Sequence, residues 1–427
     1  MSATATATAP TPATDTAPST AANLMDVSKL VVEKAVAKLI DYAVYLKASD
    51  LFFASNQHNV TVQVRHLGMI QTISIMPAEQ GRKCISYIKT AASMDLTEKR
   101  RPLDGRWIYK PDGEDAGSVD IRINMIPTMY GEDLSLRLLV RGSQLYAIEK
   151  LGLEKHQYEQ LMQMLGSASG LILLTGPTGS GKTATLYASL MYLNDGKKKI
   201  NTIEDPIEYS IDGLRQSQIF TAINLGFGEL LKSVLRQSPD VIMIGEIRDA
   251  ETADIAVRAA NSGHLVLATI HAPVASAAVQ SMRALGVHPH FLSTALRGIV
   301  SQRLVRTLCT KCKVSFDLSD APGTFDDIRP WLAADEGRQL FAATGCEICN
   351  KVGYAARSGV FEVLPITKSI RHLISENRPT SEIRAKATEE KMLEFRQAAM
   401  LKVARGVTST EEVFRVIPSE HLLEETD

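Results

Sequence analysis

The residues best suited to chemistry lie at positions 171–183, in the sequence LILLTGPTGSGKT. An apolar run typical of a strand buried on both faces leads into a glycine-rich segment with the spacing G-x-x-x-x-G-K-T. In such a loop, backbone N–H groups and the N-terminus of the following helix hold a polyphosphate. We therefore predict a nucleotide site in which Lys182 reaches the β and γ phosphates and the Thr183 hydroxyl binds Mg²⁺. The predicted nucleotide-binding residues are Gly176, Pro177, Thr178, Gly179, Ser180, Gly181, Lys182, Thr183 and Ala184.

Three further apolar runs have the pattern of buried parallel strands, and each is bordered by acids or histidines. These residues are Glu204 and Glu208 after the first run, Glu246 after the second, and His264 and His271 on either side of the third. The carboxyl ends of strands are where α/β sheets bind ligands, and carboxylates there suit Mg²⁺ coordination and the positioning of an attacking water. One strand-end acid is often only a helix cap. Three such strands beside one phosphate loop favour a catalytic site.

Four of the five cysteines form two Cys-x-x-Cys pairs, Cys309 with Cys312 and Cys346 with Cys349. Paired knuckles of this kind supply four thiolates to a tetrahedral Zn²⁺ and leave no ligand position open. We therefore predict a structural zinc site. The insert between the pairs is longer than in most such sites, so four unrelated cysteines are the alternative. Cys84 is interpreted as a small buried hydrophobe.

Three arginines form a second candidate cluster. Alternating apolar residues around Arg122 and Arg137 predict two strands joined by a hairpin loop at 127–133, with both arginines on the polar face of one sheet. Arg106 ends a basic loop predicted at 97–106 and comes near them if that loop folds over the sheet. The pattern alone leaves open whether these arginines are solvated strand residues or part of a site.

The composition limits the classes of partner. The chain has 427 residues and a formal net charge of −1, which gives no bulk electrostatic reason to expect nucleic acid or an anionic membrane as a partner. No apolar run approaches the ~18 residues that span a membrane, and the N-terminus lacks the basic and apolar parts of a secretory signal. We expect a cytoplasmic protein without a transmembrane segment. In that reducing compartment, Cys-x-x-Cys pairs indicate metal rather than disulfides.

Five regions of the chain position these candidate residues, and the predicted fold class is α/β. Residues 1–26 are low-complexity Ala, Thr, Pro and Ser and should be disordered. Residues 27–148 alternate helix and strand patterns, as expected of an α+β lobe. Buried strands alternating with helices over 149–304 predict a parallel sheet that carries the phosphate loop. A cysteine-containing zinc subdomain at 305–362 and a helical region at 363–427 complete the chain.

In combination, the motifs resemble those of secretion ATPases of the type II secretion and type IV pilus assembly superfamily. Four motifs occur in the expected order, namely the phosphate loop, an acidic box at 203–209, a second box at 238–249 and a histidine box at 263–271. The cysteine pairs follow QRLVR at 302–306 and resemble the tetracysteine module of extension-type members.

The resemblance implies a RecA-like P-loop domain preceded by a PAS-like N-terminal lobe, assembled as a homo-hexameric ring with ATP between the lobes. It implies that ATP hydrolysis drives pilin or pseudopilin assembly through an inner-membrane platform protein and other secretion components, with the cytoplasmic ring peripheral to that membrane. By position, Glu208 matches the general base, Glu204 an acid near the metal and Glu246 the Mg²⁺-side acid. The other matched catalytic residues are Lys182, the histidine pair His264 and His271, and the phosphate-reaching arginines Arg106, Arg122 and Arg137.

The chain also departs from the family pattern. About 26 low-complexity residues stand where many extension ATPases carry a separate N-terminal domain, and relatives usually have a histidine near Phe52. Ala272 and Pro273 follow His271 in place of the usual Thr-Asn. Two other functions stay open, a nucleic-acid-translocating RecA-like motor and a pilus retraction ATPase. Near-neutral charge argues against the first, and the tetracysteine module argues against the second.

Overall fold

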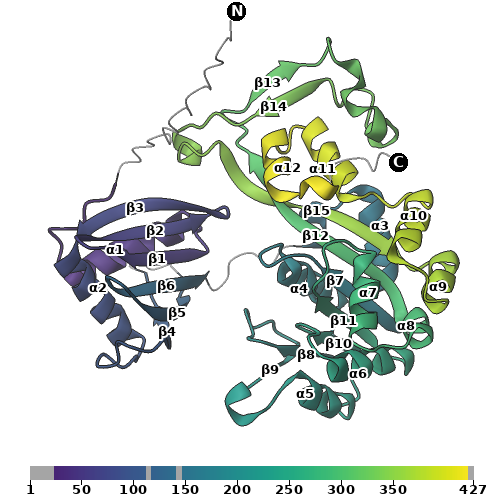
Figure 1. The fold of residues 1–427 in the computed structure, drawn as a ribbon, viewed down its shortest axis with the longest axis horizontal. Helices are drawn as coiled ribbons and strands as arrows, with labels where there is room; N and C mark the ends of the chain where they lie inside the picture. The colour runs from purple at the N-terminus through teal and green to yellow at the C-terminus, as the bar shows by residue number, and fades with distance from the viewer. Residues whose placement is uncertain (1–23, 112–116, 141–146, 422–427) are drawn as a thin grey trace, which may run out of the picture. The chain divides into compact units, whose positions relative to one another are not determined.

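A computed structural model describes residues 24–111, 117–140 and 147–421. The chain divides between positions 141 and 142 into two compact units, each of which is drawn in Figure 1. Most of the N-terminal stretch predicted to be disordered lies outside the described residues. Within the part of the chain that the structure describes, no helix has the length and hydropathy needed to cross a membrane.

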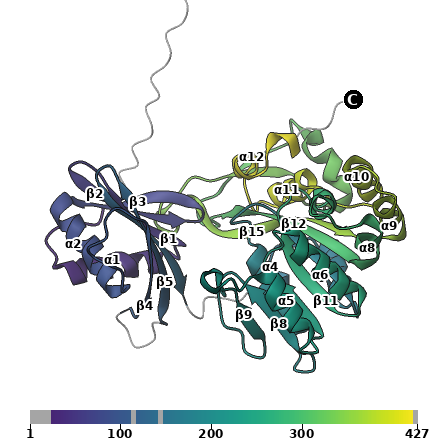
Figure 2. The same cartoon turned by 60° about the horizontal axis from the view of Figure 1, so that its bottom comes forward.

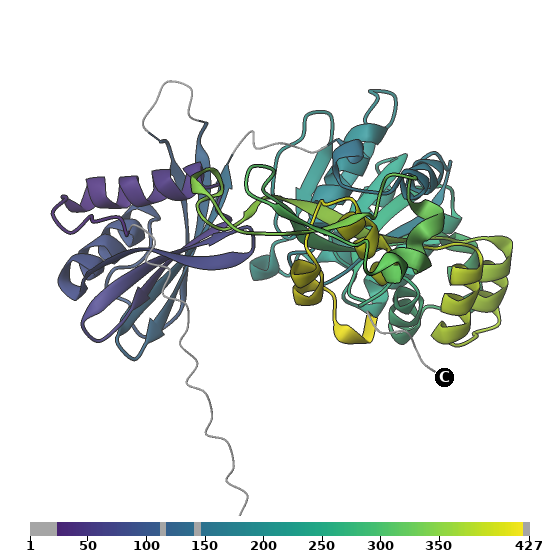
Figure 3. The same ribbon diagram turned by 90° about the horizontal axis from the view of Figure 1, so that it is seen from above.

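The N-terminal unit is a six-stranded antiparallel sheet in the order β3-β2-β1-β6-β5-β4. Side chains alternate between the two faces of a strand, and residues such as Leu51, Phe53 and Val62 form one core with the buried faces of both helices. Figure 3 shows α1 against one face of the sheet. The opposite face therefore carries the polar residues of the strands. The elements are α1 Val32–Tyr45, β1 Asp50–Ser55, β2 Asn59–His66, β3 Met69–Pro77, α2 Ala78–Ala91, β4 Leu103–Tyr109, β5 Val119–Thr128 and β6 Gly131–Val140.

Two predicted loop boundaries in this unit are wrong. The basic loop ends before Leu103, because β4 begins there and pairs with β5 along its whole length. Arg106 is therefore a strand residue. The hairpin between β5 and β6 is also tighter than predicted, since pairing continues to Thr128 opposite Gly131. Only Met129 and Tyr130 form the turn, and this tight turn fixes the register of the two strands.

The second unit is built on a seven-stranded sheet in the order β15-β12-β7-β11-β10-β8-β9, seen from a second angle in Figure 2. All neighbouring strands are parallel except β15, which pairs antiparallel with β12. The four apolar runs predicted to be buried strands are confirmed as β7, β8, β10 and β11. The strands are β7 Gly170–Thr175, β8 Ile200–Glu204, β9 Arg215–Gln218, β10 Val241–Ile244, β11 Leu265–Ile270, β12 Leu296–Leu308 and β15 Tyr354–Pro365.

Helices cover both faces of this sheet, which explains why the strands β7, β11 and β10 in its middle are mostly apolar and buried at every position. Ile172 and Leu174 of β7 pack in the core that includes α3 and α4, whereas Leu171 and Leu173 pack in the core of α5 to α10. The helices are α3 Lys155–Leu165, α4 Lys182–Leu193, α5 Phe227–Leu235, α6 Ala250–Asn261, α7 Ala277–Ala284, α8 Pro289–Ala295, α9 Lys368–Ser375 and α10 Thr380–Glu389.

An insert separates the long strands β12 and β15. It contains a two-stranded antiparallel sheet of β13 (Val314–Asp317) and β14 (Gln339–Ala342). A small core joins Phe325 and Ile328 of the insert to the last helices. These helices are α11 Phe395–Ala404 and α12 Thr410–Val416.

Candidate functional site

The phosphate loop connects β7 to α4, as its sequence requires. Gly176, Gly179 and Gly181 have φ values of +138°, +78° and +88°, in the region that favours glycine. A Cβ on Gly176 would lie 2.4 Å from the carbonyl oxygen of Gln302, so a larger residue would force the loop away from β12. Residues 177–179 are exposed. The loop is therefore both shaped by glycine and open to a ligand.

The reactive side chains of the loop lie at the start of α4. The Lys182 Nζ donates hydrogen bonds to the carbonyl oxygens of Gly176, at 2.7 Å, and Pro177, at 3.0 Å. Burial lowers the pKa of Lys182, and the negative charge of Glu246 opposes that shift. Thr183, the next residue, is exposed. A cation and a hydroxyl thus lie side by side at the end of the glycine-rich loop, and groups of this chemistry fit a phosphate and Mg²⁺.

Gln302 of β12 supports the loop, and motif matching missed this role. Its Nε2 donates to the Ser180 carbonyl oxygen at 2.6 Å, and its Oε1 accepts from the Thr185 hydroxyl at 2.7 Å. Gln302 is buried, with an exposed fraction of 2%. In the sequence, Gln302 stands out only as the first residue of the QRLVR run. Nothing in that run reveals a contact with a loop more than a hundred residues away.

The acidic box begins where β8 ends. Glu204 is 3% exposed, and its carboxylate accepts hydrogen bonds from Thr202 Oγ1 at 2.5 Å, Gln216 Nε2 at 3.0 Å and the Tyr187 hydroxyl. Glu208 lies farther along, in an irregular segment, and its backbone N–H donates to the Tyr187 oxygen at 3.2 Å. The two acids therefore have different surroundings, and the structure surrounds Glu204 with protein donors.

The second box and the histidine box meet at Glu246. Because β10 and β11 are adjacent and parallel, residues that follow them lie at the same edge of the sheet. Glu246 Oε1 is 2.6 Å from His271 Nε2, and its Oε2 accepts from Arg248 Nε at 2.6 Å. Arg248 also lies 3.4 Å from Asp205 of the acidic box. The charge of Glu246 also acts on Lys182 of the phosphate loop. Residues of all four predicted motifs therefore converge here.

His264 does not join this group. It precedes β11, whereas His271 follows it, so the strand's length, roughly 3.3 Å per residue, separates them. His264 Nδ1 is 3.0 Å from the Ala259 carbonyl oxygen at the end of α6. The pair predicted from the histidine box is thus divided between opposite edges of the sheet, because an extended strand connects its members.

The three arginines of the N-terminal unit form a row across its sheet. Arg106 of β4 is paired in register with Arg122 of β5, and Arg122 with Arg137 of β6. The register continues to Asp50 of β1 and Arg65 of β2. The prediction that Arg122 and Arg137 share one sheet face is confirmed, and the row is longer than the sequence indicated.

Carboxylates hold members of this row in place. Arg106 donates to Asp120 through Nε, at 2.8 Å, and Nη2, at 2.5 Å. Asp50 lies between two cations, 3.6 Å from Arg137 Nε and 3.4 Å from Arg65 Nε. Sequence reasoning missed both aspartates. The usable signal for Asp120 was its i, i+2 spacing from Arg122, which places both on one strand face.

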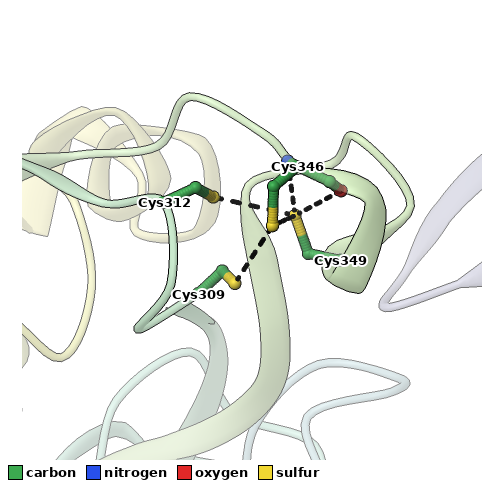
Figure 4. A group of neighbouring side chains, drawn as sticks. All are labelled: Cys309, Cys312, Cys346 and Cys349. Carbon is green, nitrogen blue, oxygen red and sulfur yellow. Dashed lines mark hydrogen bonds between the residues drawn. The ribbon is translucent and has the colours of Figure 1, made fainter.

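The four predicted zinc ligands come together, as Figure 4 shows. The sulfur atoms of Cys309, Cys312, Cys346 and Cys349 all lie within 4.8 Å of one another. The separations are 4.0 Å for Cys309 and Cys346, 3.8 Å for Cys312 and Cys349, and 3.7 Å for Cys346 and Cys349. A tetrahedron with Zn–S bonds of about 2.3 Å has sulfur atoms about 3.8 Å apart. The cluster therefore fits Zn²⁺.

Backbone donors favour a thiolate in this cluster. The N–H groups of Cys346 and Gly353 each lie 3.2 Å from the Cys349 sulfur. Burial opposes ionisation of Cys349, but these donors outweigh it and lower its pKa to about 7.

All five cysteines of the chain are free thiols, and Cys84 is buried, as predicted. Burial raises the pKa of the Cys84 thiol to about 11, which makes it unreactive.

Solved structures with related folds support an α/β, RecA-like architecture. The ATPase DotB from Yersinia pseudotuberculosis is 20% identical, with a TM-score of 0.67, and the match covers 92% of this chain and 95% of that one. The pilus retraction motor PilT with bound ADP is 24% identical, with a TM-score of 0.61, over 89% of this chain and 96% of that one. At these identities the likeness concerns the fold.

Sequence comparisons show the family. The type II secretion system protein E of Dickeya dadantii is 39% identical over 382 residues, which are 90% of this chain and 75% of that protein. The type IV pilus assembly ATPase PilB of Thermus thermophilus is 37% identical over 91% of this chain and 43% of its own length. The model of the family described as "Type II/IV secretion system protein" matches residues 26–415. This chain therefore belongs to the type II/IV secretion system protein family.

Proposed function

We propose that this chain is a motor ATPase that hydrolyses ATP to drive pilin or pseudopilin assembly by a type IV pilus or type II secretion machine. The observation that carries this proposal is the convergence of a phosphate loop, its cation Lys182 and the strand-end acid Glu246 at one edge of a RecA-like sheet. Relatives named as pilus assembly and type II secretion ATPases support the coupling to secretion.

Each residue of the site has a role that its surroundings suit. The N–H groups of the loop and Lys182 bind the phosphates. Thr183 and Glu246 would hold Mg²⁺, which offsets charge on the β and γ phosphates when it is bound. His271, which contacts Glu246, orients that carboxylate. Glu208 accepts the proton of the attacking water.

The proposed assembly follows the family. We infer a homo-hexamer in the cytoplasm that contacts an inner-membrane platform protein, and arginines of the N-terminal unit that supply cations to the phosphates. The Zn²⁺ held by the tetracysteine cluster stabilises the insert between β12 and β15. The cluster supports the extension direction over retraction.

ATP turnover by single variants tests the proposal. Lys182→Ala should abolish hydrolysis, because it removes the cation that offsets charge on the transferred phosphoryl group. Lys198→Ala is a matched control. Lys198 is an exposed lysine that follows α4, the helix that begins at Lys182, and its variant should keep wild-type turnover. Turnover of the Lys182 variant within about tenfold of wild type, in folded protein, would contradict the site.

A second pair of variants tests the base. Glu208→Gln should bind ATP and stop turnover, since an amide keeps the shape but cannot take a proton. Exposed Glu229 on α5 provides the control Glu229→Gln, which should be as active as wild type.

Addition of single-stranded DNA should leave turnover unchanged. Stimulation by DNA would favour a nucleic-acid motor instead.

A further inference from the structure

The segment that carries Glu208 has no helix or strand of its own, and side chains hold it from outside. Ile207 N–H donates to Gln218 Oε1 at 3.3 Å, and Ile211 N–H donates to Gln216 Oε1 at 2.8 Å. The Gln216 amide also donates to the Tyr209 carbonyl oxygen at 2.9 Å. A segment without regular structure depends on such contacts for its position.

These contacts converge on the buried Glu204 carboxylate. The two hydrogens of Gln216 Nε2 bond to the Tyr209 carbonyl oxygen and to Glu204 Oε1. Thr202, which lies on β8 with Glu204, donates to the same Glu204 oxygen. The other Glu204 oxygen accepts from Tyr187. A carboxylate with both oxygens engaged by three donors is a rigid fixed point, because breaking any of these bonds would leave a buried charge short of partners.

Tyr187 connects this fixed point to the Glu208 backbone. Its single hydroxyl donates to Glu204 and accepts from the Glu208 N–H at 3.2 Å. Tyr187 is 1% exposed, so water does not reach its hydroxyl and does not replace either hydrogen bond. Burial and the Glu204 charge raise the pKa of Tyr187, which keeps its proton available for donation. The ring packs edge-on against Tyr209, with 6.1 Å between the ring centroids.

We propose that Tyr187 is a positioning residue, which fixes Glu208 relative to the phosphate loop by hydrogen bonds to the Glu208 backbone and to Glu204. Tyr187 lies on α4, the helix that begins in the phosphate loop at Lys182, so one helix carries both the phosphate-binding cation and the support of the base. The inference rests on the proposed role of Glu208. It also gives Glu204 a positioning role, because donors occupy its carboxylate.

The expected consequence is a loss in the chemical step with little loss in binding. A general base must lie within about 3 Å of the proton it removes, and a displacement of about 1 Å can cost about a hundredfold in rate. The phosphate loop itself keeps its contacts with Gln302. ATP should therefore bind normally to a protein that lacks only the Tyr187 hydroxyl.

Steady-state ATPase kinetics of Tyr187→Phe test this inference, because phenylalanine keeps the ring and removes the hydroxyl. We expect kcat to fall by about tenfold or more, with KM for ATP within about twofold of wild type. Tyr192→Phe is the matched control, since Tyr192 is a half-exposed residue of the same helix, and it should match wild type. Circular dichroism and thermal unfolding establish that each variant is folded.

A second variant keeps the test decisive if Tyr187→Phe does not fold. Gln216→Leu removes the support from the other side of the segment and should also lower kcat at unchanged KM. In the double variant the two losses should not multiply, because both act on one segment. A kcat within about threefold of wild type, or a change confined to KM, overturns the inference. Glu208→Gln separates this inference from the proposed function. Normal turnover of Glu208→Gln would refute Glu208 as the general base, whereas the Tyr187 and Gln216 variants test what positions it.

Discussion

The clearest quantitative prediction concerns Gln302, which supports the phosphate loop from β12. Gln302→Met keeps an unbranched side chain of similar length and removes both hydrogen bonds. The Ser180 carbonyl oxygen then loses a 2.6 Å bond, and the Thr185 hydroxyl loses a 2.7 Å bond. Leaving a buried polar group unsatisfied costs about 1–3 kcal/mol. For two groups, the smallest expected cost is about 2 kcal/mol.

This cost should appear mainly as weaker nucleotide binding. The loop of the variant can relax to other conformations in the absence of ATP, and binding must then restore the conformation with inward N–H groups. Since about 1.4 kcal/mol corresponds to a tenfold change in affinity, about 2 kcal/mol predicts ATP binding about 30-fold weaker. Titration of a fluorescent ATP analogue measures this change. Circular dichroism checks that the sheet is intact.

Ser301→Ala is the matched control for Gln302→Met. Ser301 is the preceding residue of β12 and is fully buried, but its hydroxyl has no hydrogen-bond partner among the residues that the structure describes. Its removal should leave ATP affinity unchanged. If Gln302→Met binds ATP within about threefold of wild type, or if Ser301→Ala weakens binding equally, the support of the loop by Gln302 is refuted.

Three further predictions concern zinc, the arginine row and pH. Purified protein should contain one Zn²⁺ per chain; Cys309→Ser should lose the metal and lower the melting temperature, whereas Cys84→Ser should keep its zinc content. Arg122→Ala should bind ATP but hydrolyse it at least about a hundredfold more slowly, and recovered activity on mixing it with Lys182→Ala would show that the arginine acts across a subunit boundary. Burial raises the pKa of Glu362 from 4.5 to about 7, so the folded protein binds a proton that the unfolded chain releases, and the free energy of unfolding should fall as pH rises across that window. Glu362→Gln should make the free energy of unfolding, measured by thermal unfolding, less dependent on pH between about 4.5 and 7. An unchanged pH dependence would contradict the raised pKa of Glu362.

The amino-acid sequence by itself determined the parts of this protein that are local. The phosphate loop could be predicted because its backbone shape depends on glycines within one short segment, and the structure places them at positive φ. The cysteine pairs were also readable, because each knuckle is set by a short spacing and tetrahedral zinc requires four thiolates. Strands such as β7 and β10 could be predicted because a strand covered on both faces has a nearly continuous apolar sequence.

Tertiary structure alone decided which distant residues meet. Gln302 contacts the loop because β12 pairs with β7, and the arginine row reaches Asp50 because β1 pairs with β6. Strand register is a long-range property, since it depends on which strands become neighbours and where their pairing starts. The same reason applies to Tyr187, whose hydroxyl joins a helix to the end of β8 and a segment beyond it. No spacing within the sequence encodes such a contact, because it forms only when the helix packs on the finished sheet.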